Sequence, residues 1–352
     1  MRPDNVIGVA VIEFEEQDLE ARVPDLSAGG AWTRVRLRWR RDPLTGASAR
    51  ILTGVKLQPP TRPDLTDLAA KPPFCPFDAE HLEMATFPFP AELTSEGRIR
   101  AGKAVVVPNI LAYATHSAVG IYDPARHFLD LPELTPSLLG DALAAMVRHA
   151  QAVRRLDPTA VWSSINANYL PPAGASLVHP HLQSAHDAHG LTGQRFLVER
   201  AGSWQERRGA YWAALLEQEA GGPRWLGQIG RSSWLTPFAP TGFHEVWGVV
   251  AGAADVTELT EEDCQALGRG LAQVFAAYYA WNLSSFNFGL IGGGPQGREQ
   301  GHQVLLKVVS RSNPEPMYRS DATYFERLHG EAMIDLSPEE VASAVAAKFA
   351  AD

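Results

Sequence analysis

Two stretches of the chain carry apolar residues at the spacing of an α-helix. In residues 137–156 and 261–280, apolar side chains recur every three or four positions. Each stretch follows the same entry, Glu-Leu-Thr, which ends at Thr135 in the first case and at Thr260 in the second. Pro136 stands at the first helical position of the first stretch, where its missing N–H costs nothing. The pattern predicts two amphipathic helices that look like copies of each other.

A strand-like segment with a common opening follows each predicted helix. Residues 163–166 read SSIN and residues 284–287 read SSFN, at nearly the same distance from the helix before them. This similarity indicates an internal duplication. We therefore expect an α+β fold with two similar halves, residues 1–198 and 199–352, in which a largely antiparallel sheet carries helices packed on it.

A third helix is predicted at the C-terminal end. Ser337 is followed by Pro338 at the first helical position and by Glu340 at the third. This arrangement combines a capping box with a favourable proline and predicts a helix start.

Polar and apolar residues alternate in residues 176–184, which read SLVHPHLQS. On an extended strand, His179, His181 and Gln183 would share one face, and Val178, Pro180 and Leu182 the other. Because proline removes a donor from a sheet, the segment is expected at an edge or an irregular stretch beside a cleft. A half-buried strand with a polar outer face would show the same alternation, so the surrounding residues decide between structure and function.

A loop rich in proline and glycine leads into the two histidines. It contains Asn166, Asn168, Gly174 and Ser176. Glycine lets a backbone approach a ligand closely, and a serine hydroxyl can donate to a phosphate oxygen. An ordinary turn has a similar composition. Because this loop leads directly into the two histidines, however, it predicts a phosphate-binding site. The corresponding segment of the second half runs instead into the apolar stretch 304–310, so one active site is expected per chain.

Composition narrows the class of protein. The chain has 352 residues, of which 45% are hydrophobic and 20% charged, and a formal net charge of −9. These values are typical of a globular protein of more than one domain, and the negative charge argues against a nucleic-acid partner. No apolar run reaches the roughly 18 residues of a membrane span. With only Cys75 and Cys264 and no signal-peptide pattern, a disulfide framework is excluded and a cytoplasmic location is expected.

The pattern N-x5-G-x-S-x2-H-P-H-x-Q resembles the active-site signature of the galactose-1-phosphate uridylyltransferase branch of the histidine-triad superfamily. Other segments resemble that family in the same order: RRDPLTG at 40–46, PPFCPF at 72–77, PNILAY at 108–113, DPARHFLDLPELT at 123–135 and FERLHGEAMIDLSPEEVA at 325–342. The resemblance implies two histidine-triad-like halves, the second of them catalytically degenerate. It also implies a homodimer.

The resemblance assigns roles to the loop and the histidines. His181 would take the nucleotidyl group on a neutral imidazole, with its other ring nitrogen held by a backbone carbonyl and His179 acting as an orienting residue. Gln183 would bind the phosphoryl oxygens without passing a proton to water, which favours transfer over hydrolysis. Asn109 would contact the nucleoside, and the phosphates would be held by Asn168, Gly174 and Ser176. Lys56 and Arg62 are looser phosphate candidates.

The chain departs from the family at its metal and sugar sites. The family's zinc ligands align with Pro72, Cys75, His127 and His179, so one ligand of four is missing. Because structural zinc prefers four ligands, no metal is expected and no cofactor is required, although a water, Asp78 or Glu80 could complete the set. A second metal site is absent, with Leu306 and Val308 in place of histidines. Met333 replaces a glutamine that contacts the sugar phosphate.

Three functions fit these residues. The first is a nucleotidyltransferase that moves a nucleoside monophosphate, UMP-like, between a sugar nucleotide and a sugar 1-phosphate. The second is a phosphorylase that uses inorganic phosphate as acceptor and a sugar nucleotide or dinucleoside polyphosphate as donor. The third is a non-catalytic nucleotide-binding protein. All three imply small-molecule partners and neither nucleic acid nor membrane.

Overall fold

Ten strands form one sheet at the centre of the molecule. The computed structural model describes residues 11–25, 28–53, 60–315 and 320–349. The strand order is β4-β5-β6-β8-β7-β12-β13-β11-β10-β9, and every adjacent pair is antiparallel. The strands span β4 Ile99–Ala101, β5 Ala104–Pro108, β6 His116–Ile121, β7 Trp162–Tyr169, β8 His181–Asp187, β9 Trp225–Ile229, β10 Ser232–Leu235, β11 Val246–Val250, β12 Ser285–Ile291 and β13 Val304–Arg311.

The strand order has the symmetry that a duplication predicts. Strands β4 to β8 and β9 to β13 occur in the same chain order, and they lie in mirrored order about the β7–β12 seam. In that seam Ala167 lies opposite Phe288, and these two residues also correspond in the repeat. A pseudo-twofold axis therefore passes between them, and the α+β duplicated fold is confirmed. The expected boundary at 198/199 falls inside helix α4 (Thr192–Arg208), and a division at that point remains a prediction.

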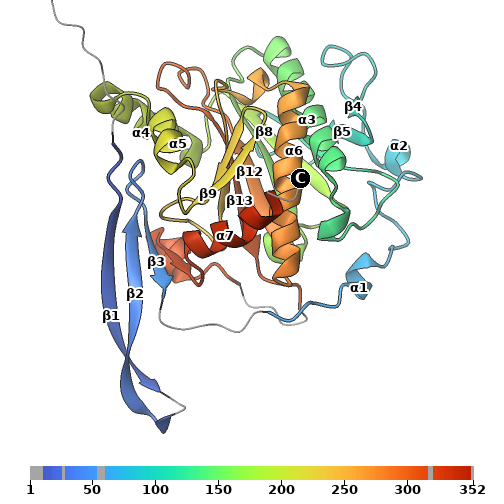
Figure 1. The fold of residues 1–352 in the computed structure, drawn as a ribbon. Helices are drawn as coiled ribbons and strands as arrows, with labels where there is room; N and C mark the ends of the chain where they lie inside the picture. Colours follow the sequence, from blue (N-terminus) through green and yellow to red (C-terminus); the bar gives the residue numbers. More distant parts are fainter. Residues whose placement is uncertain (1–10, 26–27, 54–59, 316–319, 350–352) are drawn as a thin grey trace, which may run out of the picture.

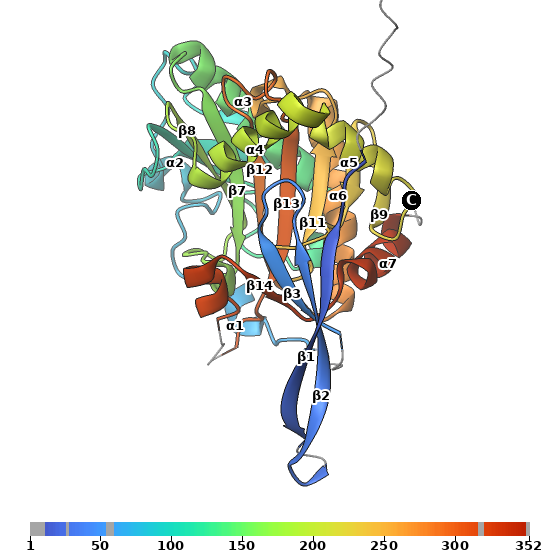
Figure 2. The same cartoon turned by 90° about the vertical axis from the view of Figure 1, so that its left-hand side faces the viewer.

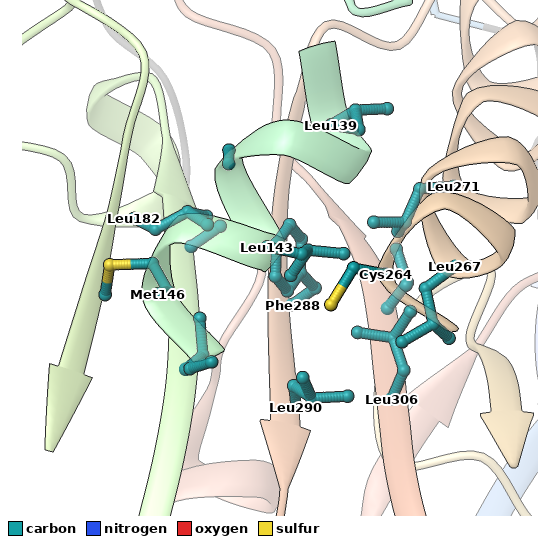
Figure 3. Close-up of a cluster of buried hydrophobic side chains, with 14 of the residues drawn as sticks. Leu139, Leu143, Met146, Leu182, Cys264, Leu267, Leu271, Phe288, Leu290 and Leu306 are labelled. Carbon is teal, nitrogen blue, oxygen red and sulfur yellow. The ribbon is translucent and has the colours of Figure 1, made fainter. Parts of the chain in front are cut away.

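The two repeated helices lie side by side on one face of the sheet (Figure 1). They are α3 (Pro136–Leu156) and α6 (Glu261–Ala280), as the apolar period predicts. The side chain of Thr135 accepts a hydrogen bond from Leu138 N, and that of Thr260 accepts one from Asp263 N, so each threonine caps its helix. Their apolar faces meet side chains of β8, β12 and β13 in one core, shown in Figure 3, which includes Leu143, Met146, Leu182, Cys264, Leu267, Phe288 and Leu306.

Other elements cover the opposite face and the end of the sheet. Helices α4 and α5 (Tyr211–Glu219) pack on that face through a second core centred on Trp212 and Trp247 (Figure 2). Helix α7 (Pro338–Phe349) contacts α6 and β9. Ser337 Oγ accepts from Glu340 N, and the Glu340 carboxylate accepts from Ser337 N, which confirms the predicted capping box.

A second sheet stands apart from the duplication. It has four strands in the order β1-β2-β3-β14, with bounds β1 Glu15–Asp25, β2 Ala31–Arg41, β3 Ser48–Leu52 and β14 Ala332–Ile334. Strands β1 and β2 form a long hairpin that projects beyond the body (Figures 1 and 2). The short strand β14 pairs with β3 in parallel and ties the C-terminal region to the hairpin.

Short helical turns connect these elements: α1 Thr66–Ala69, α2 Leu82–Ala85, 3₁₀ turns at Leu131–Glu133, Pro171–Ala173 and Val256–Glu258, and a π-helical turn at Phe325–His329. Among the described residues, no helix combines the length and the apolar character needed to cross a membrane.

Candidate active site

His181 is the first residue of strand β8, and His179 lies in the bend before it. The expectation that both histidines share one strand face is therefore wrong. Pro180 has no N–H to extend a ladder, and its carbonyl instead accepts a hydrogen bond of 3.2 Å from Tyr122 N. The ring of His179 is fully buried and turns away to a different group of side chains.

The imidazole of His181 is held in one tautomer. Its Nδ1 donates to the carbonyl oxygen of His179 over 2.8 Å, as the resemblance implies, so Nε2 carries the lone pair. No hydrogen bond in the described part of the chain uses that nitrogen. The ring of Phe77 packs edge-on at 5.3 Å, and the side chain is only 9% exposed. Burial lowers the pKa of His181, which keeps the ring neutral and nucleophilic near pH 7.

Gln183 points to the same face of the sheet as His181, two residues further along β8. It lies directly opposite Val119 of β6 and Asn166 of β7. The intervening residue, Leu182, faces the core under α3 and α6, so the polar residues face away from those helices. Gln183 is half-buried, and its carboxamide makes no hydrogen bond to another described residue. Its donors are available to a ligand beside His181.

Asn168 lies beside His181 on the neighbouring strand. The register that places Ala167 opposite Leu182 brings Asn168 level with His181 on the same face. Across the seam, Asn168 Oδ1 accepts a hydrogen bond of 2.7 Å from Asn287 Nδ2. The sequence reasoning placed Asn168 here but missed Asn287, although the repeat aligns Asn287 with Asn166.

The loop between β7 and β8 presents two of the predicted phosphate ligands. Gly174 has φ of +93°, a conformation that favours glycine, and it is exposed. Ser176 is also exposed, and its hydroxyl has no hydrogen-bond partner among the described residues. The carbonyl of Ala173 accepts from Asn287 Nδ2 over 2.9 Å, which fixes the turn just before Gly174. This loop therefore has free donors at a defined position.

Asn109 follows strand β5, beyond the level of Gln183. Its Oδ1 accepts from Leu111 N over 3.0 Å, so the side chain closes a turn and keeps its amide group for other contacts. The loop that it opens exposes Ile110, Leu111 and Tyr113, which are 79%, 63% and 81% exposed. Such a loop offers apolar and aromatic surface that a nucleobase could contact.

Three further candidates are not brought to His181. Lys56 lies outside the described residues. Arg62 donates to the carbonyl of Tyr279 and stacks on its ring at 3.5 Å, at the end of α6. Met333 lies on β14 and lines a cavity of 1580 Å³ between the hairpin, α7 and the second half, and neither His181 nor Gln183 lines that cavity.

Four potential metal ligands meet behind His181. Ligand atoms of Cys75, Asp78, His127 and His179 all lie within 4.8 Å of one another. Asp78, one of the two acids expected as a possible substitute, is thus the fourth member of this group, and Pro72 is not part of it. Four potential ligands are present, and whether they hold a metal stays a prediction.

The hydrogen bonds in this cluster fit a bound cation. His179 Nε2 donates to the carbonyl of Asp123 over 3.1 Å, which leaves Nδ1 unprotonated in a neutral ring. That nitrogen faces Asp78 Oδ1 at 3.0 Å, so two acceptors point at each other. The other oxygen, Asp78 Oδ2, is buried and has no hydrogen-bond partner among the described residues, with the Lys71 ammonium 3.6 Å away. A histidine that donates one nitrogen to a backbone carbonyl and turns the other to a carboxylate and a thiol is typical of a metal ligand.

The second half carries different residues at the corresponding positions. The strand registers relate His181 to Lys307 and Gln183 to Val309. Leu306 and Val308, expected at the family's second metal site, face the core under α6. Within the described ranges, no group of potential metal ligands lies in this half.

Comparisons with known proteins agree with this architecture. No family model matches the chain. A curated protein of Archaeoglobus fulgidus, described only as an uncharacterized protein, is 26% identical over 329 residues, 93% of this chain and 96% of its own length. The crystal structure of an ADP-glucose phosphorylase from Arabidopsis thaliana with bound ADP-glucose matches with a TM-score of 0.66 and 17% identity, over 88% of this chain and 98% of that chain.

A structure of uridylyltransferase matches with a TM-score of 0.64 and 20% identity, over 89% of this chain and 98% of that chain. A galactose-1-phosphate uridylyltransferase-like protein from Arabidopsis thaliana gives a TM-score of 0.67 at 17% identity, over 88% and 98% of the two chains. The class is therefore a duplicated α+β protein. Its particular fold is the one that these uridylyltransferase and phosphorylase structures share.

Proposed function

We propose that the protein is a nucleotidyltransferase that moves a nucleoside monophosphate through a covalent nucleotidyl-His181. The observation that carries this proposal is the single tautomer of His181. Its Nδ1 is bonded to a backbone carbonyl, while its Nε2 lone pair lies beside the uncommitted donors of Gln183 and Asn168. The fold shared with a uridylyltransferase and an ADP-glucose phosphorylase supports the same chemistry.

The reaction takes two steps with one bond exchanged in each. In the first step, His181 Nε2 attacks the α-phosphorus of a sugar nucleotide, and the P–O bond to the sugar 1-phosphate breaks. In the second step, a phosphate oxygen of the acceptor attacks the same phosphorus, and the P–N bond breaks. No proton transfer to the phosphorus centre is needed, because both the leaving group and the acceptor are phosphate anions. Donors from Gln183, Asn168 and Ser176 would stabilise the charge that develops on the phosphoryl oxygens.

A divalent metal such as zinc would be held by Cys75, Asp78, His127 and His179. Bound there, it supplies structural rigidity and no group that reacts. His179 is the residue whose carbonyl fixes the His181 tautomer. A fixed His179 ring therefore keeps that carbonyl in place.

The acceptor in the first candidate function is a sugar 1-phosphate, with a UMP-like group transferred. A second candidate is a phosphorylase with inorganic phosphate as acceptor. The observation that favours it is Met333, whose thioether cannot replace the carboxamide donors with which the resemblance implies a sugar phosphate would be held. The match to an ADP-glucose phosphorylase supports it too.

A test begins with the donor alone. The purified protein is incubated separately with UDP-glucose, UDP-galactose and ADP-glucose, and its intact mass is measured. We expect one donor to leave its nucleoside monophosphate on His181 with release of one equivalent of sugar 1-phosphate. His181→Ala should abolish both, whereas His189→Ala, which changes an exposed histidine beyond the end of β8, should change neither.

The adduct then identifies the acceptor. Addition of galactose 1-phosphate or glucose 1-phosphate should regenerate free enzyme if the protein is a transferase, and addition of inorganic phosphate should do so if it is a phosphorylase. Full turnover by His181→Ala would refute the covalent route. Nucleotide binding without an adduct from any donor would instead support the non-catalytic class.

A further inference from the structure

A chain of side-chain hydrogen bonds crosses the seam between the halves and ends at the candidate active site. Asn287, on strand β12 of the second half, donates from Nδ2 to Asn168 Oδ1 over 2.7 Å. On its other side, Asn287 Oδ1 accepts from Arg311 Nη1 over 2.6 Å. Arg311 is held in turn by Asp321, whose two carboxylate oxygens accept from its Nε at 2.8 and 3.0 Å.

This chain sets the orientation of both amides. A guanidinium can only donate, so the atom of Asn287 that faces Arg311 must be its oxygen. The NH₂ group of Asn287 then faces Asn168, and the atom of Asn168 that receives it must again be an oxygen. Oxygen and nitrogen of an amide are normally told apart only through such a network. Asn287 Nδ2 also lies 2.9 Å from the Ala173 carbonyl oxygen and 3.2 Å from the Ala167 carbonyl oxygen, and both acceptors require the NH₂ group on this side.

This orientation leaves the Nδ2 group of Asn168 on the side away from Asn287. Its Nδ2 carries two hydrogens, and no described residue accepts either of them. The strand register places Asn168 level with His181 on the same face of the sheet. The Asn168 amide therefore presents donors, and not an acceptor, toward the space beside the His181 ring.

We propose that Asn287 is a positioning residue that turns the Asn168 amide so that it donates to the phosphoryl group transferred to His181. This inference rests on the proposed function. Asn287 belongs to the half whose own histidine position carries Lys307, and the repeat relates it to Asn166. The second half thus contributes to the reaction through the seam, without touching the substrate.

Asn287→Asp tests the proposal with almost no change of shape. A carboxylate at this position still accepts from Arg311 but cannot donate to Asn168 Oδ1. The Asn168 amide then flips to donate to the carboxylate, and its oxygen turns toward the phosphate site. We expect formation of the nucleotidyl adduct from the active donor of the three, followed by mass spectrometry under single-turnover conditions, to slow by roughly 10²-fold. The melting temperature should fall, because the carboxylate also loses the bonds to the Ala167 and Ala173 carbonyls, and the double-mutant cycle described below separates this loss from the effect on Asn168.

Asn282→Asp is the matched control. Asn282 has a similar bond, from Nδ2 to the carbonyl of Pro60 over 3.0 Å, but it lies at the surface beyond the end of α6. The rate of adduct formation in this variant should equal that of the wild type. An unchanged rate in Asn287→Asp as well would overturn the proposal.

A double-mutant cycle separates positioning from a general effect on the loop. Asn287 also donates to the carbonyl of Ala173, so its loss could act on the turn and not through Asn168. If Asn287 acts through Asn168, then adding Asn287→Asp to Asn168→Ala should slow adduct formation by less than about twofold. A slowing as large as in the wild-type background would show that Asn287 acts by another route, and the proposal would fail.

A third measurement does not depend on catalysis. The chain contains only seven asparagines, so selective ¹⁵N labelling of asparagine gives few side-chain signals in a nuclear magnetic resonance spectrum. The Asn168 signal is assigned by its loss in Asn168→Ala. In Asn287→Asp it should shift and its amide protons should exchange more slowly, because they then donate to a carboxylate. An unchanged Asn168 signal overturns the proposal even if no donor forms an adduct, while absence of the adduct in the wild type overturns only the proposed function.

Discussion

In the proposed reaction, Gln183 would determine whether the intermediate on His181 is transferred or hydrolysed. A carboxamide donates hydrogen bonds to phosphoryl oxygens but has no proton that ionises near neutral pH. We expect Gln183→Ala to slow transfer by roughly 10²–10³-fold, because one preorganised donor is lost. The measurement is the rate of sugar 1-phosphate release in the first turnover.

Gln183→His makes the complementary change at the same position. An imidazole can relay a proton to or from water where an amide cannot, so hydrolysis of the adduct should rise relative to transfer. The ratio of free nucleoside monophosphate to sugar nucleotide, measured by chromatography, reports the partition. Equal partition in wild type and Gln183→His would contradict the role given to the amide.

Two buried histidines, His149 on α3 and His186 on β8, make the free energy of unfolding depend on pH. His149 Nδ1 and His186 Nε2 lie 3.2 Å apart, and burial lowers the pKa of His149 to about 4. An unfolded histidine has a pKa near 6.5, so the unfolded state binds more protons between these values. The free energy of unfolding should be constant above pH 6.5 and should fall as pH drops toward 4, by on the order of 3 kcal/mol for His149.

Urea unfolding of wild type and His149→Gln at pH 7, 5.5 and 4.5 measures this dependence. The variant should lose less stability between pH 7 and 4.5 than the wild type does. His189→Gln, at an exposed position, should keep the wild-type slope. The interpretation fails if His149→Gln and wild type lose equal stability over this range.

Sequence reasoning reached some of these residues and not others for a physical reason. His181, Gln183 and Asn168 are close together in the chain, and the register of two neighbouring strands is enough to bring them together. Asn287 contacts Asn168 across more than a hundred positions and was not predicted, and Asp78, which contacts His179 at a similar separation, was named only as one of several possible ligands. Local periodicity carries no information about such contacts. The sequence pointed to Asp78 only through its position three residues after Cys75, and to Asn287 only through the repeat that aligns it with Asn166.

At the scale of elements, helices α3 and α6 approach so closely that one glycine is required between them. A Cβ on Gly268 would lie 2.5 Å from Pro136 O and 2.6 Å from Gly140 N, and a backbone cannot yield as a flexible side chain does. Gly268→Ala should therefore destabilise the protein by about 1–3 kcal/mol, measured as a lower midpoint of thermal or urea unfolding.

Gly193→Ala is the control for the helix propensity of alanine. Gly193 lies in the first turn of α4, and an added Cβ there meets no atom within 4 Å. This substitution should leave stability unchanged or raise it by up to about 1 kcal/mol. If Gly268→Ala were as stable as Gly193→Ala, the helix contact would be looser than described.

The four potential metal ligands lie on three connecting segments: the loop before α2, the loop after β6 and the bend before β8. We expect purified protein to hold about one zinc per chain after dialysis, measured by elemental analysis. Asp78→Ala should lose it, since three ligands bind zinc less completely than four. Asp78→Cys should retain it, because thiolate is a preferred zinc ligand at this spacing.

Glu92→Ala provides the control, since Glu92 is an exposed carboxylate outside both groups of potential metal ligands in the described residues. Its zinc content should match the wild type. Wild-type protein without metal after expression in zinc-containing medium would contradict the assignment and leave the cluster held by hydrogen bonds alone.

The elements themselves followed closely from the sequence. The two long helices and the C-terminal helix begin where the caps at Thr135, Thr260 and Ser337 predict, because capping is a local interaction. The projecting hairpin of β1 and β2 was not predicted. Its exposed strands are stabilised by each other, including ion pairs such as Arg38–Asp18, so their sequence lacks a buried apolar face to detect.

At the scale of the whole molecule, the resemblance predicts a homodimer. In one chain, the cavity lined by Met333 and Tyr324 is separate from His181. In a dimer, one chain could bring Met333 and Tyr324 to His181 of the other chain. This would explain why the segment 325–342 and the segment around His181 both resemble the same family. We expect light scattering to give twice the 38.3 kDa of a single chain. A mass of one chain at micromolar concentration would contradict the dimer.

The seam between β7 and β12 also has a consequence during synthesis. The ribosome completes His181 and β8 well before Asn287 and Arg311, and at roughly 5–20 residues per second the interval is on the order of ten seconds. Throughout it β7 is an edge strand, with unpaired N–H and C=O groups that can pair with another nascent chain. The proposed nucleophile, His181, is therefore synthesised before the edge of the sheet is closed. A truncated product that ends before β12 would carry every predicted catalytic side chain and still lack the strand that closes its edge.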